Sequence, residues 1–155
     1  MLLDFDSISD DSRLWVYGSE TKLTTEQQEY ILQKIGEYLK NWEYHKKPLT
    51  AAVTILEGYF IIVALDSSEY GVGGCSIDSL QRILQDIECK LNISLLNRLN
   101  IFCRIDNNIE CIPTTKLAEN TNKDTFFYDL TIQKKSELSS WLKLIEKGWC
   151  ISFLS

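Results

Sequence analysis

Residues 51–65 of the chain read AAVTILEGYFIIVAL. Two runs rich in β-branched and aromatic residues, Ala51–Leu56 and Tyr59–Leu65, are separated by the dipeptide Glu57-Gly58, which favours a tight turn. This spacing predicts a β-hairpin. The second run is apolar at every position, so we expect it to be a central strand that is covered on both faces.

The segments before this hairpin predict one strand and one helix. Arg13–Tyr17 is a short β-rich run that ends at Gly18-Ser19. Thr24 and Thr25 are followed three residues later by glutamines, the pattern of a capping box. Apolar residues then recur at helical spacing, which predicts a helix that runs to about Trp42. Pro48 prevents its continuation.

The segments after the hairpin predict further helices and strands. An amphipathic helix is expected after the loop that ends near Gly74, and the residues on its apolar face are Ile77, Leu80, Leu84, Ile87 and Leu91. The other expected elements are a hairpin of Ile101–Ile105 with Ile109–Ile112, a short helix at Thr115–Glu119, a strand at Thr125–Tyr128, a helix at Lys134–Glu146 ended by Gly148, and a strand at Trp149–Leu154.

Length and composition predict one folded domain. The chain has 155 residues, of which 45% are hydrophobic and 25% are charged, the balance of a globular protein. Helices and hairpins in this order indicate an α+β fold with a largely antiparallel sheet and about three main helices. We expect this domain to cover residues 13–155, after a loose acidic N-terminal arm of residues 1–12.

Charge and hydropathy exclude several classes of partner. The formal net charge is −6 and the arginines are scattered, so we expect no binding to nucleic acid. The longest apolar run, Tyr59–Leu65, is far shorter than the roughly 20 residues that span a bilayer, so we expect no membrane segment. The acidic start is unlike a signal peptide, which predicts a cytoplasmic protein. The sequence indicates no cofactor and no metal.

The segment Gly71–Asp78, GVGGCSID, is the strongest candidate site. Its glycines permit a close backbone approach, and the helix that follows leaves unpaired N–H groups at its start. Gly73, Gly74, Ser76 and Asp78 are candidate ligand-binding residues for a small anion. Cys75 is a candidate nucleophile with a thiol activated by the helix start, although Asp78 would oppose thiolate formation. The alternative is that Cys75 fills a gap in the core and Ser76 caps the helix.

Two known phosphate sites do not fit this segment. A Walker loop requires a lysine after its last glycine, where this chain has Cys75. Thiol-dependent phosphatases place five residues between cysteine and arginine. Six residues separate Cys75 from Arg82, which turns the arginine about 100° away around a helix.

Other candidates are weaker. His45 is the single histidine and would have to serve as the base for Cys75, but a residue at this place is commonly a solvated helix end. If residues 106–108 form a three-residue turn, Cys103 faces Cys111, which allows a reversible disulfide, half a metal site or two buried thiols. An aromatic groove is a further possibility, with core packing as its alternative; its residues would be Trp15, Tyr17, Trp42, Tyr59, Trp141 and Trp149.

Three segments resemble a known family. Arg13–Tyr17, Gly74–Asp78 and Lys135–Trp141 are similar to segments in short bacterial proteins of unknown function that are often labelled ABC transporter ATPases. The likeness covers about Ser12 to Leu154 and implies a small cytoplasmic protein that stands alone. It implies no catalytic residues. The missing Walker lysine and the short chain indicate that this protein is not an ABC ATPase.

These observations favour a non-enzymatic protein that binds a small anionic ligand or a protein partner near residues 71–78. One alternative is a thiol-dependent enzyme with Cys75 as nucleophile and His45 as base. The other is a structural subunit of a larger assembly.

Overall fold

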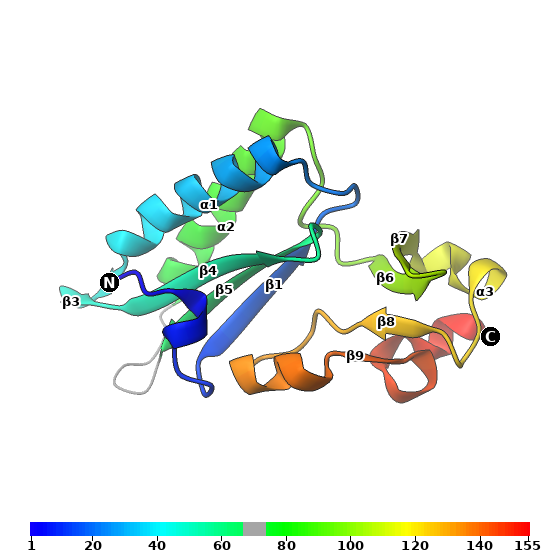
Figure 1. Cartoon of the computed structure of the whole chain (residues 1–155). Helices are drawn as coiled ribbons and strands as arrows, with labels where there is room; N and C mark the ends of the chain where they lie inside the picture. The colour runs from blue at the N-terminus through cyan, green and yellow to red at the C-terminus, as the bar shows by residue number, and fades with distance from the viewer. Residues whose placement is uncertain (67–73) are drawn as a thin grey trace. The chain divides into compact units, whose positions relative to one another are not determined.

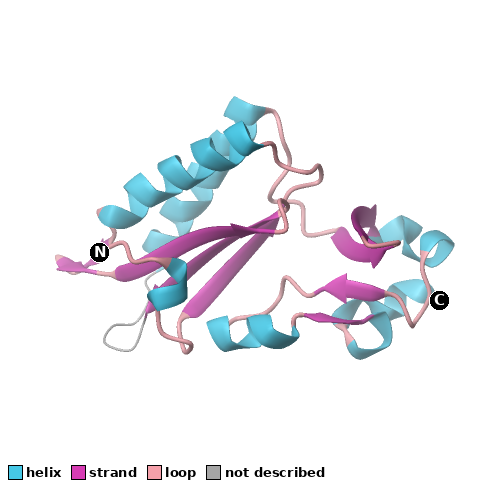
Figure 2. Cartoon of the chain, viewed as in Figure 1, coloured by secondary structure: helices cyan, strands magenta, loops and turns pink. Residues whose placement is uncertain are grey.

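The computed structural model describes residues 1–66 and 74–155, with side chains in the second range described from residue 77 onward. The chain is a small α+β domain, and every ladder between its described strands is antiparallel, which confirms the expected fold class (Figure 2). Within this domain the chain forms two compact units. Unit 1 comprises Met1–Leu96 and Gln133–Ser136; unit 2 comprises Asn97–Ile132 and Glu137–Ser155.

Unit 1 is built on the predicted hairpin. Strands β4 (Thr50–Leu56) and β5 (Phe60–Asp66) pair, and β1 (Arg13–Gly18) lies on the other side of β5, so the strand order is β1-β5-β4. Glu57 and Gly58 both have positive φ in the connecting turn. Residues 60–65 are fully buried, which confirms that β5 is a central strand covered on both faces.

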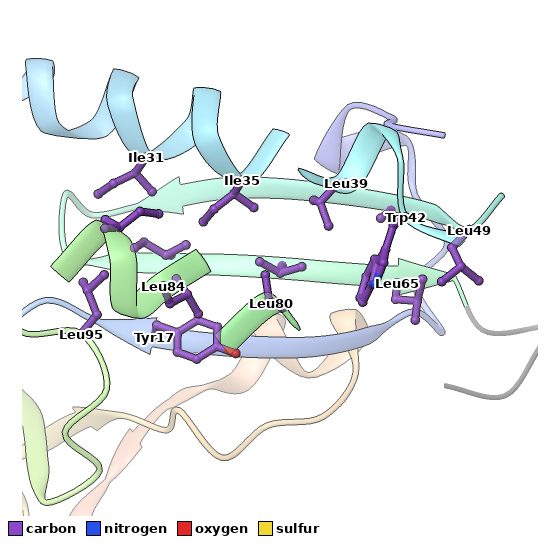
Figure 3. Packing of buried hydrophobic residues seen from close by; sticks show 14 of the residues in the cluster. Tyr17, Ile31, Ile35, Leu39, Trp42, Leu49, Leu65, Leu80, Leu84 and Leu95 are labelled. Atoms are coloured by element: carbon purple, nitrogen blue, oxygen red, sulfur yellow. The ribbon is translucent and has the colours of Figure 1, made fainter. Parts of the chain in front are cut away.

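Helices α1 (Thr25–Lys40) and α2 (Gly74–Leu91) pack on one face of this sheet (Figure 1). The predicted capping box is present, because Thr24 accepts from the Gln27 N–H and Gln27 accepts from the Thr24 N–H. Figure 3 shows the apolar layer between helices and sheet, which includes Ile31, Ile35 and Leu39 of α1 and Leu80 and Leu84 of α2.

The N-terminal residues differ from the loose arm expected for residues 1–12. Leu2 pairs in parallel with Ala51 of β4, and the Leu3 N–H donates to the Ala51 carbonyl. A short 3-10 helix η1 (Phe5–Ser7) follows, and Ile8 is 3% exposed. The physical reason is that an edge strand offers unpaired backbone groups, which this arm satisfies while it buries its apolar side chains.

Helix α1 ends earlier than expected, and a short ladder follows it. Strands β2 (Glu43–Tyr44) and β3 (Lys47–Pro48) pair around a turn in which His45 and Lys46 have φ values of 51° and 64°. This places His45 at the tip of a small hairpin instead of at a helix end.

Unit 2 contains an antiparallel sheet of order β7-β6-β8-β9. Its strands are β6 (Asn100–Ile105), β7 (Asn108–Pro113), β8 (Phe126–Tyr128) and β9 (Leu142–Leu144). The predicted hairpin and the predicted strand near residue 126 are confirmed. The expected short helix is present as η2 (Thr114–Lys116) followed by α3 (Leu117–Asn120).

The register expected for the β6–β7 hairpin is wrong. Ile105 pairs with Asn108, so the turn holds two residues, Asp106 and Asn107, with φ values of 52° and 66°. Aspartate and asparagine tolerate positive φ, and two such residues form the turn whose twist matches that of the strands. As a result Cys103 faces Glu110, and it lies on the opposite face of the ladder from Cys111.

The helix expected at Lys134–Glu146 is absent from the structure. A 3-10 helix η3 (Lys135–Ser140) is followed by β9 and by η4 (Ile145–Lys147). The serines of residues 134–146 compete for backbone hydrogen bonds and weaken an α-helix. Trp141 and Ile145 are buried, Leu142 is exposed, and Leu142 pairs with Tyr128. Sheet pairing therefore decides this segment.

The expected strand at Trp149–Leu154 is also wrong, because these residues form the 3-10 helix η5. Cys150 is buried and Leu154 is partly buried in the core of unit 2. A 3-10 turn satisfies its backbone groups within the segment, by hydrogen bonds between residues three apart, whereas a strand here would require a neighbouring strand to pair with.

Candidate functional site

The glycine segment falls largely outside the described residues. Gly71–Gly73 lie outside them, and for Gly74, Cys75 and Ser76 the structure describes the backbone as the first turn of α2. Asp78 is described, and its side chain is exposed on the same helix. The anion site and the reactive thiol therefore stay predictions.

His45 is exposed, and its ring lies edge-on against the ring of Tyr44, with 4.2 Å between the centroids. This contact is made within the β2–β3 hairpin. The role of His45 as a base for Cys75 also stays a prediction, because the side chain of Cys75 is outside the described part of the chain.

Two of the described thiols of unit 2, those of Cys103 and Cys150, are buried and unsuited to catalysis. Cys103 and Cys150 are 0% exposed and share one apolar cluster with Phe127. Burial raises the pKa of Cys103 to about 12, with a further contribution from Cys150, and burial raises the pKa of Cys150 to about 11. Both therefore remain protonated thiols near neutral pH.

This burial gives a testable order of thiol reactivity. With iodoacetamide near neutral pH, we expect exposed Cys89 to be alkylated and Cys103 and Cys150 to react only after denaturation. Peptide mapping by mass spectrometry measures the three sites in one sample. Alkylation of Cys103 in the native protein at the rate of Cys89 would contradict the burial described here.

Three of the six aromatic residues of the expected groove are buried. Tyr17 and Trp42 are each 4% exposed in the core of unit 1, and Trp141 is 8% exposed in unit 2. Trp15 packs edge-on against Trp42 at 6.2 Å between centroids. Core packing, the alternative interpretation, accounts for the three buried residues and for Trp15, whereas Trp149 is 41% exposed.

A groove of about 570 Å³ lies along the outer edge of β4, and we call it the β4 groove. Its lining consists of Leu2–Ser7, Leu32 of α1, and Val53 and Thr54 of β4. The arm forms one wall because its pairing with Ala51 stops at Leu3, where the chain turns into η1. Beyond that point the arm no longer pairs with the strand.

The backbone of β4 has unpaired groups in this groove. The Ala51 N–H donates to the Met1 carbonyl and the Ala51 carbonyl accepts from Leu3, so both Ala51 groups face away from β5. In an antiparallel ladder every second residue faces the same way. Val53 and Ile55 therefore direct their N–H and C=O groups outward, and no group in the described part of the chain bonds to them there.

The opposite edge of the same sheet is covered differently. The outward Leu14 N–H of β1 donates to the Gln133 carbonyl, and the Lys135 N–H donates to the Ser12 carbonyl. Unit 1 thus uses two separate segments of chain to cover its sheet edges. On the β4 side, Val53 and Ile55 lie beyond the pairing of the arm.

No protein-family model, curated protein or solved structure matches this chain. The residues of the site therefore have to be judged by their own chemistry. In the ranges that the structure describes, no helix has the length and apolarity to cross a membrane, and no group of three potential ligands is placed to hold a metal ion.

The sequence of β4 lacks the residues that usually protect an edge strand, and this is the one sequence feature that points to the β4 groove. Edge strands are commonly protected by lysine, proline or inward charges, and Ala51–Leu56 has none of these. That absence agrees with either a central strand or an open edge. The distinction requires the strand order, which shows that β4 lies at the edge.

Proposed function

We propose that this chain is a non-enzymatic binding protein whose partner is another protein, and that an extended segment of the partner adds as a strand to the edge of β4. The observation that carries this proposal is the pair of outward residues Val53 and Ile55, whose backbone groups lack partners among the described residues. Val53 lines the β4 groove, and Ile55 continues the same strand edge beyond it. Strand addition to an exposed edge is a common mode of peptide recognition.

The backbone groups supply the affinity in this mode. An extended peptide beside β4 would accept from the N–H groups of Val53 and Ile55 and donate to their carbonyls. Each such hydrogen bond contributes about 1 kcal/mol net. Main-chain bonds do not depend on the partner's sequence, so side-chain contacts with the groove walls must supply specificity.

A protein partner is favoured over a small anion for a reason of charge. Asp4 and Asp6 line the β4 groove, and both are exposed. Carboxylates repel an anionic ligand, whereas a peptide backbone is neutral. The described groove therefore supports one of the two partner classes that the sequence suggested.

The experiment uses a proline at the outward position. The Val53 N–H makes no ladder bond with β5, so Val53→Pro removes a donor from the groove and leaves the sheet hydrogen bonds in place. A displayed library of random nine-residue peptides is selected on the unaltered chain. We expect the selected peptides to bind Val53→Pro about tenfold more weakly.

Val53→Ala is the matched control, because it shortens the same side chain and keeps the N–H group. It should retain most of the binding. Hydrogen exchange gives a second measurement that needs no variant, since the amides of Val53 and Ile55 should become protected when a selected peptide binds. Equal binding to both variants together with unprotected amides would refute strand addition.

A further inference from the structure

We infer that the segment recognised by the β4 groove is basic as well as apolar; this inference rests on the strand addition proposed above. The groove combines two exposed carboxylates with apolar walls, and its floor is an unpaired strand edge. A strand that presents a lysine or arginine beside a small apolar residue matches all three features.

The carboxylates of the groove are not neutralised by the described protein. Asp4 and Asp6 flank Phe5 in η1, and neither side chain has an ion pair or a hydrogen bond with a described residue. Both carboxylates are therefore available to a group bound in the groove. A cationic side chain of a bound strand is the complementary group.

Lys135 lies beside this turn, but its ammonium is bonded to other groups. The ammonium of Lys135 donates to the carbonyls of Phe5 and Ile8, each at 2.8 Å, and it lies 4.0 Å from an Asp10 carboxylate oxygen. These bonds tie both ends of η1 to the side chain of Lys135. Lys135 thus fixes the chain that carries Asp4 and Asp6 without pairing with their carboxylates.

The apolar walls complete the match. Leu2 and Phe5 are half-buried on the arm, and Leu32 of α1 is 36% exposed beside them. Side chains of an added strand alternate between its two faces. One face of a bound strand can therefore contact these apolar residues while other residues reach the acidic rim.

The same charges disfavour a second copy of this chain as the occupant. Pairing of β4 with β4 of another molecule would put two acidic grooves against each other, and each chain has a net charge of −6. Like charges across such an interface weaken association. A partner segment of opposite charge avoids this cost.

The test compares two labelled peptides by fluorescence anisotropy at low ionic strength. One alternates valine with lysine and threonine, and the other has glutamate in place of every lysine. We expect the lysine peptide to bind about tenfold more tightly, since it gains ion pairs with Asp4 and Asp6 where the glutamate peptide is repelled. Added salt should reduce this preference.

Variants locate the preference. Asp4→Asn combined with Asp6→Asn should reduce it to about twofold or less. The matched control is Asp11→Asn combined with Glu29→Gln, which changes the net charge equally on exposed residues that do not line the groove. This control should keep the preference.

The outcomes separate the inference from the proposed function. Equal binding of both peptides, lost in Val53→Pro, would overturn the basic specificity and leave strand addition standing. Binding that Val53→Pro does not change would overturn both. Failure of both peptides to bind would overturn the basic specificity. A dimer in sedimentation that Val53→Pro dissociates would identify a second copy as the occupant and refute the inference.

Discussion

Gly148→Ala is expected to lower the free energy of unfolding by about 3 kcal/mol. A Cβ atom at Gly148 would lie 2.1 Å from Cζ and 2.3 Å from Cε1 of Phe127, far inside van der Waals contact. The Phe127 ring is 0% exposed in the core of unit 2, so it cannot turn aside without repacking its neighbours. Urea denaturation followed by fluorescence measures the loss.

Gly36→Ala is the matched control for this substitution. Gly36 lies inside α1, and a Cβ atom there would meet Leu2 Cδ2 at 3.6 Å, an ordinary contact. Alanine in a helix interior is favoured over glycine by about 1 kcal/mol, so this variant should be stabilised. A Gly148→Ala protein as stable as the unaltered chain would contradict the packing of Gly148 on Phe127.

Asp129→Ala is expected to cost about 3 kcal/mol of stability. The Asp129 side chain accepts hydrogen bonds from the N–H and hydroxyl of Thr131 and, at 2.9 Å, from the ammonium of Lys143. The two charged side chains are 11% and 30% exposed. Alanine would leave a half-buried ammonium and a backbone N–H without their acceptor.

The same carboxylate predicts how stability depends on pH. Burial alone would raise the pKa of Asp129, but the hydrogen bonds from Thr131 and Lys143 outweigh it and the pKa is lowered. A lowered pKa contributes stability that is present above the unfolded value of about 3.9 and is lost as the pH falls through the folded value. The difference between the unaltered protein and Asp129→Asn should therefore shrink below about pH 4. A difference that stays constant down to pH 2 would refute this linkage.

The architecture of unit 1 was predictable because its signals agree at every level. The apolar run at residues 59–65, the turn dipeptide Glu57-Gly58 and the capping box at Thr24 each require a local structure that the fold also requires. Tertiary contacts therefore confirmed the local preferences.

Unit 2 shows where local patterns fail. Residues 138–145 have apolar spacing that fits a helix, yet the same residues alternate well enough to form β9, and the backbone of β8 was available to pair with them. In the β6–β7 hairpin, one residue more or less in the turn exchanges the faces of every side chain. Hydrophobic periodicity reports neither the pairing of β9 with β8 nor the number of residues in the β6–β7 turn.

The candidate site was not predictable for a related reason. The open edge of β4 depends on where residues far apart in sequence end their pairing: the arm departs at Leu3, and β5 lies on the other side. A sequence pattern identifies a strand but not its neighbours. Glycine-rich segments such as residues 71–74 attract attention because their signal is local.

The course of the chain between the two units limits how the protein can be dissected. After residues 97–132 the backbone returns to unit 1, where Gln133 and Lys135 bond to Leu14 and Ser12, and it leaves again at Glu137. A fragment that ends at Leu96 would lose the backbone bonds from residues 133–135 and expose the edge of β1 near Leu14. A fragment beginning at Asn97 would carry four residues that belong elsewhere. Proteolytic or recombinant separation should therefore give aggregation-prone halves, whereas co-expression of both halves could restore the native assembly.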